Sequence, residues 1–320
     1  MKRRRLGLVC GLALATAVGV GQAEKAAVAK GASDPLNVTL EVRVEQSRKA
    51  VPGLTARNFR VYENGEPREV TRAEPAGPAS IVLLVENSLH SWRFLNDVRS
   101  AMRGFLSAAP EEKGHSYALV TYTGRPVVEQ TLTKEIDLVR AAFVDAQQSA
   151  WGRTDTYDAL HRVLEEVEGL PGRRVLIFVG FGYDAFSHHT FGELQQKLEA
   201  TNAQAYGFAT GSDLRREPRR LDQTSQPSDL RDGEMLVRML ADRSGGKWFC
   251  PGCEADFIDS MRETMETLDR QYTVEYQRPA IPKTGFHKLK VEAFRLDDDV
   301  RTDFRVRARE GWRIPGSKGK

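Results

Sequence analysis

The chain has 320 residues, 40% of them hydrophobic, and its 47 basic and 44 acidic side chains give a formal net charge of +3. Four of the basic residues lie within the first five positions, and without them the formal charge is −1. So small a charge creates no long-range field to recruit nucleic acid or an anionic membrane. The length exceeds what one core usually serves, so we expect one large and one small folded unit.

The first 23 residues have the pattern of a secretory signal peptide. Met1–Arg5 is cationic, Leu6–Gly21 is apolar and uncharged, and Gly21-Gln22-Ala23 offers the small residues that a signal peptidase requires. The apolar run is short for a membrane span, although a retained N-terminal anchor is the alternative. We therefore expect an exported protein, periplasmic or extracellular, without a membrane span after cleavage and with a disordered leader over residues 24–34.

Both ends of the remaining chain contain segments with the period-two alternation of half-buried strands. Asn64-Gly65 supplies a tight turn between two such segments. The expected strands are residues 37–44, 59–62, 67–71, 272–277, 287–296 and 302–309. Neither set can bury a sheet face alone, so residues 35–78 and 271–312 are predicted to form one small antiparallel β-sandwich, followed by a tail over 313–320. Two independent β appendages are the alternative.

Between these segments, residues 79–270 alternate between helical and strand patterns. This order predicts an α/β domain with a central, mainly parallel sheet, inserted between the two parts of the sandwich. The expected helices are residues 92–108, 134–147, 156–168, 191–200, 234–243 and 255–270. The expected strands are residues 80–86, 116–121, 127–131, 174–179, 203–209 and 247–249. Residues 211–233 are long and polar and predict a mobile surface loop.

The strand at residues 80–86 is predicted to lie at the centre of this sheet. Ile81–Val85 is a run of five apolar residues, which cannot alternate between a wet and a dry face and is therefore covered on both sides. A polar loop follows at once. Because ligands bind where the carboxyl ends of parallel strands meet, we expect a binding edge there.

Three stretches resemble the loops that follow the strands of a von Willebrand factor type A domain, namely Ile81–Ser91, Gly152–Leu160 and Val175–Asp184. The resemblance implies that residues 79–270 form such a Rossmann-like domain. The flanking stretches resemble the secreted bacterial proteins often named VWFA-related acidobacterial domain proteins, through Val51–Thr55, Asn58–Gly65 and Gly245–Phe249.

In that family, one Asp and two Ser of the first loop, a Thr of the second and an Asp of the third hold Mg²⁺ or Mn²⁺. Here the resemblance places Glu86, Ser88 and Thr154 at three of these positions. His90 stands at the second Ser position, with Ser91 one residue later, and Phe181 stands at the last Asp position and offers no oxygen. The resemblance therefore implies a degenerate metal-ion-dependent adhesion site. No cofactor is expected, and Mg²⁺ or Mn²⁺ on Glu86, Ser88 and Thr154 is the alternative.

The predicted function is that of a non-catalytic, protein-binding or adhesion-type module whose protein ligand is unknown. The candidate binding edge comprises Glu86, Ser88, His90, Ser91, Trp92, Thr154, Asp155, Phe181, Tyr183 and Asp184. Exposed aromatic side chains at Trp92, Phe181 and Tyr183 are expected to supply most of the contact. A buried carboxylate at Glu86 needs a partner, for which His90 is a candidate. Ser88 or Ser91, and Thr154 or Asp155, could instead cap the helices that follow.

Cys250-Pro251-Gly252-Cys253 has the spacing of thiol-disulfide oxidoreductases, in which a helix N-terminus activates the first thiol. In an exported protein the same spacing also suits a small structural disulfide, which we expect here. A periplasmic redox protein is the alternative function, and shared metal binding is a further one. No Ser-His-Asp order, phosphate-binding loop or pair of carboxylates stands out as catalytic, so the chain is not expected to be an enzyme.

Overall fold

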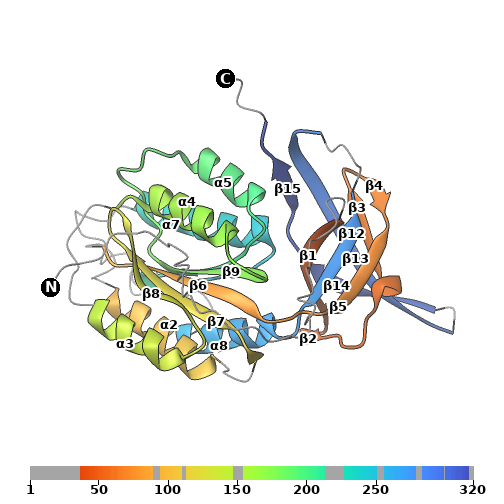
Figure 1. Cartoon of the computed structure of the whole chain (residues 1–320), viewed down its shortest axis with the longest axis horizontal. Coiled ribbons are helices and arrows are strands. Elements are labelled where there is room, and N and C mark those ends of the chain that lie inside the picture. The colour runs from red at the N-terminus through yellow and green to blue at the C-terminus, as the bar shows by residue number, and fades with distance from the viewer. Residues whose placement is uncertain are drawn as a thin grey trace, which may run out of the picture.

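A computed structural model describes residues 37–88, 94–109, 113–146, 154–212, 227–250, 256–278, 283–298 and 300–316. The fold is mixed α/β and contains a six-stranded and a nine-stranded sheet, which lie side by side (Figure 1). The predicted signal peptide and leader lie outside the described residues. No helix in the described part is both long and apolar enough to cross a membrane.

Strand β6 (Ala79–Glu86) is central in the six-stranded sheet, whose order is β11-β10-β9-β6-β7-β8. It pairs in parallel with β7 (Ser116–Tyr122) and β9 (Arg173–Gly180), and all eight of its residues are buried. Strands β10 (Gln204–Ala209) and β11 (Trp248–Phe249) continue the parallel order. Strand β8 (Pro126–Thr133) runs antiparallel to β7 because only three residues connect them, too few for a crossover.

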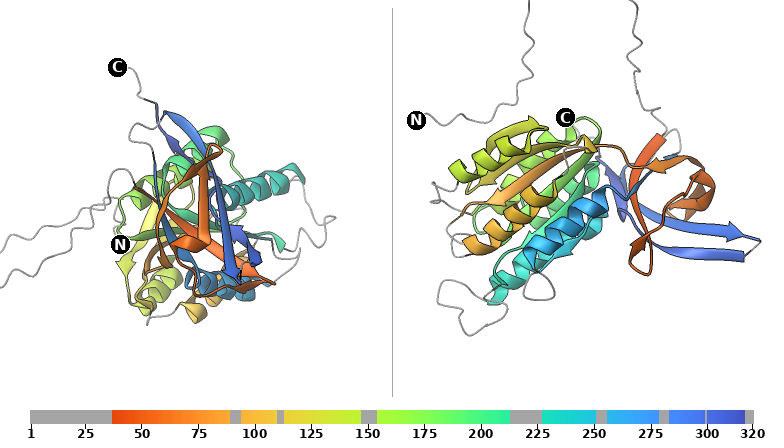
Figure 2. Two further views of the ribbon diagram at one scale, coloured as in Figure 1. Left: turned by 90° about the vertical axis from the view of Figure 1, so that its right-hand side faces the viewer. Right: turned by 90° about the horizontal axis from the view of Figure 1, so that it is seen from below.

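Helices cover both faces of this sheet (Figure 2). Ile81, Leu83 and Val85 join one core with α2 (Leu95–Ala108), α3 (Ile136–Ala146) and α8 (Phe257–Leu268). Val82 and Leu84 join a second core with α4 (Thr156–Glu168), α5 (Phe191–Ala200) and α7 (Pro227–Ser244). Alternate side chains of one strand thus enter opposite cores, as its continuous apolar run indicates.

Helix α7 begins earlier than expected. The prediction placed a loop up to Gly233 and a helix from Glu234, whereas the helix already includes Pro227–Gly233. Gly233 lies inside the helix and against the backbone of Phe181: an added Cβ would stand 2.1 Å from the Phe181 carbonyl oxygen. A glycine is required at position 233 because the helix packs closely against this backbone, and not because the chain turns there.

Strands from the two ends of the chain pair into the nine-stranded antiparallel sheet. The N-terminal ones are β1 (Asn37–Gln46), β2 (Lys49–Ala50), β3 (Phe59–Glu63), β4 (Glu66–Arg68) and β5 (Val70–Pro75), with a short 3-10 helix, η1 (Ala56–Asn58), before β3. The C-terminal ones are β12 (Tyr272–Gln277), β13 (Gly285–Asp297), β14 (Val300–Arg307) and β15 (Gly311–Ile314). The expected return strand at residues 67–71 is therefore two strands, and the expected tail at 313–320 begins inside β15.

These strands are joined into one continuous sheet, whereas a sandwich of two sheets was expected. The reason lies in β1, which pairs with β12 through Asn37–Val42 and with β14 through Arg43–Glu45. One long strand therefore connects both halves. Their inner side chains form a third core that includes Leu40, Phe59 and Trp312.

Candidate functional site

The carboxyl ends of the parallel strands bring together three segments, Glu86–Ser88, Thr154–Asp158 and Phe181–Thr190, which we call the loop edge. Glu86 ends β6, Thr154 and Asp155 precede α4, and Phe181 follows β9. The structure thus gathers most of the predicted site residues. His90, Ser91 and Trp92 lie outside the described residues, so their predicted roles stay predictions.

The Glu86 carboxylate is buried at the centre of the loop edge and accepts hydrogen bonds from two segments. The Ser88 hydroxyl donates to Oε1 at 2.5 Å, and the backbone N–H groups of Phe181 and Gly182 donate to Oε2 at 2.7 and 3.2 Å. The glutamate also needs Gly180 beside it, because a Cβ there would lie 2.7 Å from both the Cβ and Oε2 of Glu86. Backbone N–H groups thus supply part of the hydrogen bonding that a buried carboxylate needs, and the predicted contact with His90 stays a prediction.

Phe181 is 0% exposed, which corrects the expectation of an exposed aromatic contact. Its ring stacks on Phe94, with 5.2 Å between the ring centroids, so it belongs to the interior. The side chain that does reach the surface is Phe186, which is 52% exposed. We did not single it out from the sequence. The available signal was a single large apolar residue within the polar stretch Asp184–Thr190.

Two hydroxyl groups that the sequence did not suggest link the loop edge to β7. The Thr156 hydroxyl donates to the Tyr183 carbonyl oxygen at 2.6 Å. The Tyr122 hydroxyl lies 3.2 Å from the Thr156 hydroxyl, and either oxygen can be the donor of the bond between them. Burial and then the Glu86 charge raise the pKa of Tyr122 well above its ordinary value, so the Tyr122 hydroxyl stays neutral. Tyr122 pairs with Glu86 in the sheet register, which only the strand order reveals.

Asp184 connects the loop after β9, residues 181–190, which we call the third loop, to the start of α4 by hydrogen bonds. It accepts from the Tyr157 backbone N–H at 3.0 Å and from the Ser187 hydroxyl at 2.5 Å. Asp155 precedes the helix, but its side chain makes no capping hydrogen bond, so the predicted local cap is replaced by this distant one. Thr154 is buried, and its carbonyl oxygen accepts from the Ala185 N–H at 3.1 Å.

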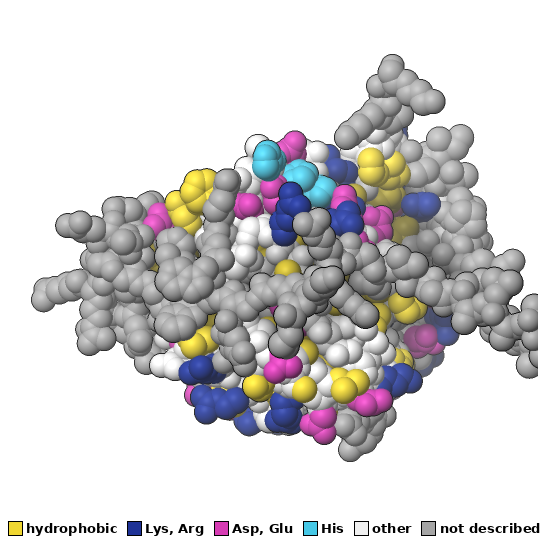
Figure 3. All heavy atoms as spheres, turned by 60° about the vertical axis from the view of Figure 1, so that its left-hand side comes forward, with side chains coloured by type: hydrophobic (Ala, Val, Ile, Leu, Met, Phe, Trp, Pro, Cys, Tyr) yellow, Lys and Arg dark blue, Asp and Glu magenta, His cyan; other side chains and the backbone are white. Residues whose placement is uncertain are grey.

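Asp158 and three histidines form a cluster beside Asp184, and Figure 3 shows histidine side chains gathered among acidic and basic ones. Asp158 accepts from the backbone N–H groups of His188 and His189, and the Nδ1 atoms of both rings lie 3.1 and 2.7 Å from its oxygens. Partial burial raises the pKa of Asp158, but these hydrogen bonds outweigh burial and hold that pKa well below its usual range. The His189 ring stacks on His161 at 3.9 Å.

A divalent cation would need oxygen ligands around Glu86. The backbone N–H groups of Phe181 and Gly182 reach this carboxylate, and their positive ends repel a cation. Phe181 contributes no oxygen. In the described part of the chain, no group of three or more His, Cys, Asp or Glu side chains could hold a metal ion, and this includes Asp158 with its neighbouring histidines.

Cys250 is buried directly after β11. Its predicted partner Cys253 lies outside the described residues. The disulfide, and the redox pair that was its alternative, therefore stay predictions.

No family model matches the chain, and no curated protein matches it. Solved structures that resemble it include a mutant of the PilB minor pilin of Streptococcus sanguinis (TM-score 0.47, 7% identity, covering 62% of each chain). Others are the manganese-loaded TRAP protein of Plasmodium vivax (TM-score 0.43, 12% identity, 80% of this chain and 99% of that one) and the vWF domain of the pilus tip protein Mfa5 of Porphyromonas gingivalis (TM-score 0.30, 19% identity, 37% and 44%). This chain spans less than two thirds of the minor pilin's length. With every TM-score below 0.5, none of these similarities supports a function.

Proposed function

We propose that the loop edge is a protein-binding surface that works without a metal ion, in an exported, non-catalytic adhesion-type protein. The observation that carries the proposal is the Glu86 carboxylate, whose oxygens already accept from Ser88, Phe181 and Gly182. Both backbone donors point at Oε2, so a cation that bound this oxygen would have to displace them or approach their positive ends. Leaving a buried N–H group without its acceptor is costly, which disfavours a cation at Oε2.

Hydrogen bonds from backbone N–H groups to carboxylates hold the segments of the loop edge rigidly in place. Glu86, Asp184 and Asp158 each accept backbone N–H groups from another segment of the loop edge. Asp97 of α2 does the same for the next loop, accepting from the N–H groups of Gly211 and Ser212 at 2.8 and 2.9 Å. Loops held in this way lose little conformational entropy when a partner binds.

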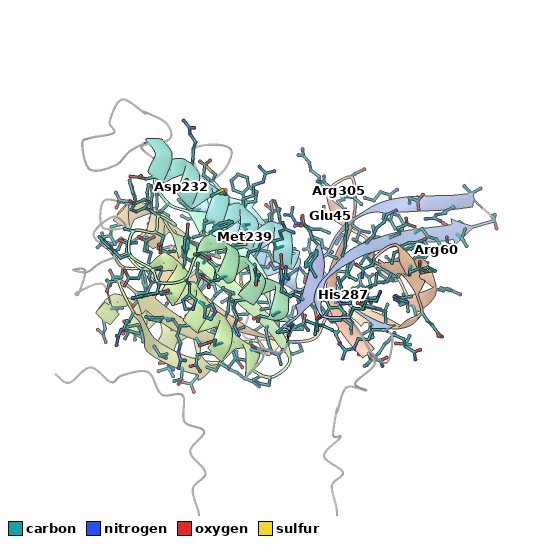
Figure 4. The ribbon with its side chains drawn as sticks, turned by 90° about the horizontal axis from the view of Figure 1, so that it is seen from above. Glu45, Arg60, Asp232, Met239, His287 and Arg305 are labelled. Carbon is teal, nitrogen blue, oxygen red and sulfur yellow. The ribbon has the colours of Figure 1, made fainter. Side chains whose placement is uncertain are left out.

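The chemistry of the surface supports a proposal for the class of partner. Phe186 offers an exposed aromatic anchor, and Tyr183 belongs to the same loop. Burial and then the charges of Asp229, Asp184 and Asp232 raise the pKa of Tyr183, which places acidic groups around it. Figure 4 shows Asp232 near the outer end of α7. An aromatic anchor with an acidic rim fits a partner that presents an apolar residue among basic ones.

The test is capture of a binding protein from a cell-envelope extract, in EDTA and in millimolar Mg²⁺ or Mn²⁺. We expect the same protein to bind with equal affinity in all three buffers. Phe186→Ala should weaken binding about 30-fold, because anchoring aromatics contribute about 2 kcal/mol.

The matched control is Leu138→Ala, which removes another exposed apolar side chain, from α3. It should bind as the wild type does. Binding that requires Mg²⁺ or Mn²⁺ and is lost in Glu86→Gln would contradict the proposal and establish a metal-dependent adhesion site. Equal affinity of Phe186→Ala and wild type would show that the partner docks elsewhere.

A further inference from the structure

A partly open cavity of about 450 Å³ lies between the two sheets. The antiparallel sheet contributes Thr39 and Glu41 of β1 and Thr273 of β12, and the six-stranded sheet contributes the first residues of β9 and β10. The cavity is therefore at the amino ends of the parallel strands, the opposite end from the loop edge. Its size is that of small-molecule sites, which often lie where two folded units meet.

The lining carries more positive than negative charge. It includes three arginines, Arg173, Arg174 and Arg309, and one carboxylate, Glu41. Arg173 and Glu41 form an ion pair, with 2.8 Å between Nε and Oε2. The charges of Arg174 and Arg309 therefore have no counterpart among the described residues that line the cavity.

Arg309 is an unusual buried cation. Its guanidinium donates to three uncharged oxygens, those of Gly311 (2.7 Å), Asn202 (3.2 Å) and Glu199 (2.9 Å, backbone). The Glu199 carboxylate is itself held by Arg313 at 2.8 Å. Burial lowers the pKa of Arg309 to about 10, although the charges of Tyr276 and Glu199 oppose this fall, so the group stays charged at neutral pH. A buried cation that forms no direct ion pair with the described residues favours a nearby anion.

Two side chains that line the cavity carry hydrogen-bond donors that can still bind an acceptor. Arg174 donates through Nε to the Leu170 carbonyl oxygen at 2.7 Å, and within the described residues its two terminal nitrogens have no partner. The same holds for the Thr39 hydroxyl. Pro78 and Ala203 add apolar surface to the lining, which suits an organic group better than a bare inorganic ion.

We propose that this cavity binds a small organic anion, whose carboxylate or phosphate group is held by the Arg174 guanidinium and the Thr39 hydroxyl. A guanidinium pairs with either oxyanion through two parallel hydrogen bonds, and the charge of Arg309 strengthens the attraction. This site is independent of the proposed function of the loop edge, and either can fail without the other.

Titration calorimetry with succinate and with glycerol phosphate, at constant ionic strength, tests the proposal and separates the carboxylate from the phosphate. We expect saturable binding of at least one of them. Arg174→Gln should weaken it about tenfold or more, because a charge-assisted hydrogen bond is lost. Thr39→Val, which keeps a branched strand residue, should weaken it less.

Arg140→Gln is the control, because it removes the same charge from the surface of α3, away from the cavity. It should leave the affinity unchanged. Absence of saturable binding, equal affinity in Arg174→Gln, or equal weakening in Arg140→Gln would overturn the proposal. Should Arg174→Gln fail to fold, unchanged affinity in Thr39→Val would overturn it.

Discussion

At the scale of single residues, the segments of the loop edge are connected by hydrogen bonds from backbone N–H groups to carboxylates. Asp158 shows this most clearly, because it accepts from two backbone N–H groups and lies within hydrogen-bond distance of two imidazoles. All of these donors favour the ionised form. The sequence indicated only that His188 and His189 are adjacent, and it did not indicate that both face one aspartate.

Asp158 therefore makes stability depend on pH. A carboxyl group whose pKa is lower in the folded than in the unfolded chain stabilises the fold above the unfolded pKa, near 3.9, and this stabilisation is lost as the pH falls through the folded pKa. We expect Asp158→Asn to lower the free energy of unfolding by about 1–2 kcal/mol at pH 7. Thermal unfolding midpoints of wild type and variant should converge as the pH falls below about 4.

Asp137→Asn on α3 is the control, because Asp137 is 86% exposed and pairs with Arg140 on the surface of the same helix. It should change the midpoint little at any pH. A difference between wild type and Asp158→Asn that stays constant from pH 7 to pH 3 would contradict the assignment.

At the scale of elements, the third loop and α7 approach each other more closely than any side chain would allow. Gly182 has a φ of +78°, and an added Cβ there would lie 3.0 Å from the Gly233 carbonyl oxygen. On the other side, Gly233 faces the Phe181 carbonyl oxygen. This contact positions the third loop, and with it Phe181 and Phe186.

Gly233→Ala should therefore destabilise the protein, although alanine is the better helix former. The clash with backbone should cost about 1–3 kcal/mol, more than the gain of about 1 kcal/mol in helix propensity. Urea unfolding measures the difference. Gly192→Ala in α5 is the matched control, since the Thr190 hydroxyl, at 4.0 Å, is the only atom of the described residues near its Cβ position. That variant should be neutral or stabilised, and a neutral Gly233→Ala would contradict the close approach.

At the scale of the whole molecule, Arg173 connects the two sheets. It begins β9, donates to the backbone oxygens of Gly77 and Leu268 and to the Gln271 side chain, and pairs with Glu41 of the antiparallel sheet. Burial raises the pKa of Glu41, and the charge of Arg173 opposes that rise. Removing Arg173 leaves a buried carboxylate without its cation.

Arg173→Met should therefore lower the free energy of unfolding by about 3–5 kcal/mol, as the loss of one partner of a buried pair does. Adding Glu41→Gln should restore part of this loss, because the uncompensated charge is then gone. A double-mutant cycle in urea measures the coupling. Strictly additive losses would show that the pair does not join the sheets energetically.

The sequence by itself determined the elements whose signal is local. Helices α4 and α5 and strand β12 have the predicted bounds, and β6 is central, because periodicity and apolar runs record burial within a few residues. It also indicated that the ends of β6 and β9 would meet, since parallel strands share an edge.

Only the tertiary structure decided which groups meet there. Glu86 accepts hydrogen bonds from backbone N–H groups that lie 95 and 96 positions away in the sequence. The residues around these donors do not indicate which group accepts from them. Phe181 stacks on Phe94, Gly233 of α7 packs against the backbone of Phe181 and Gly182, and β1 joins both β segments through its two partners. Such contacts are long-range, and local sequence patterns carry no record of them.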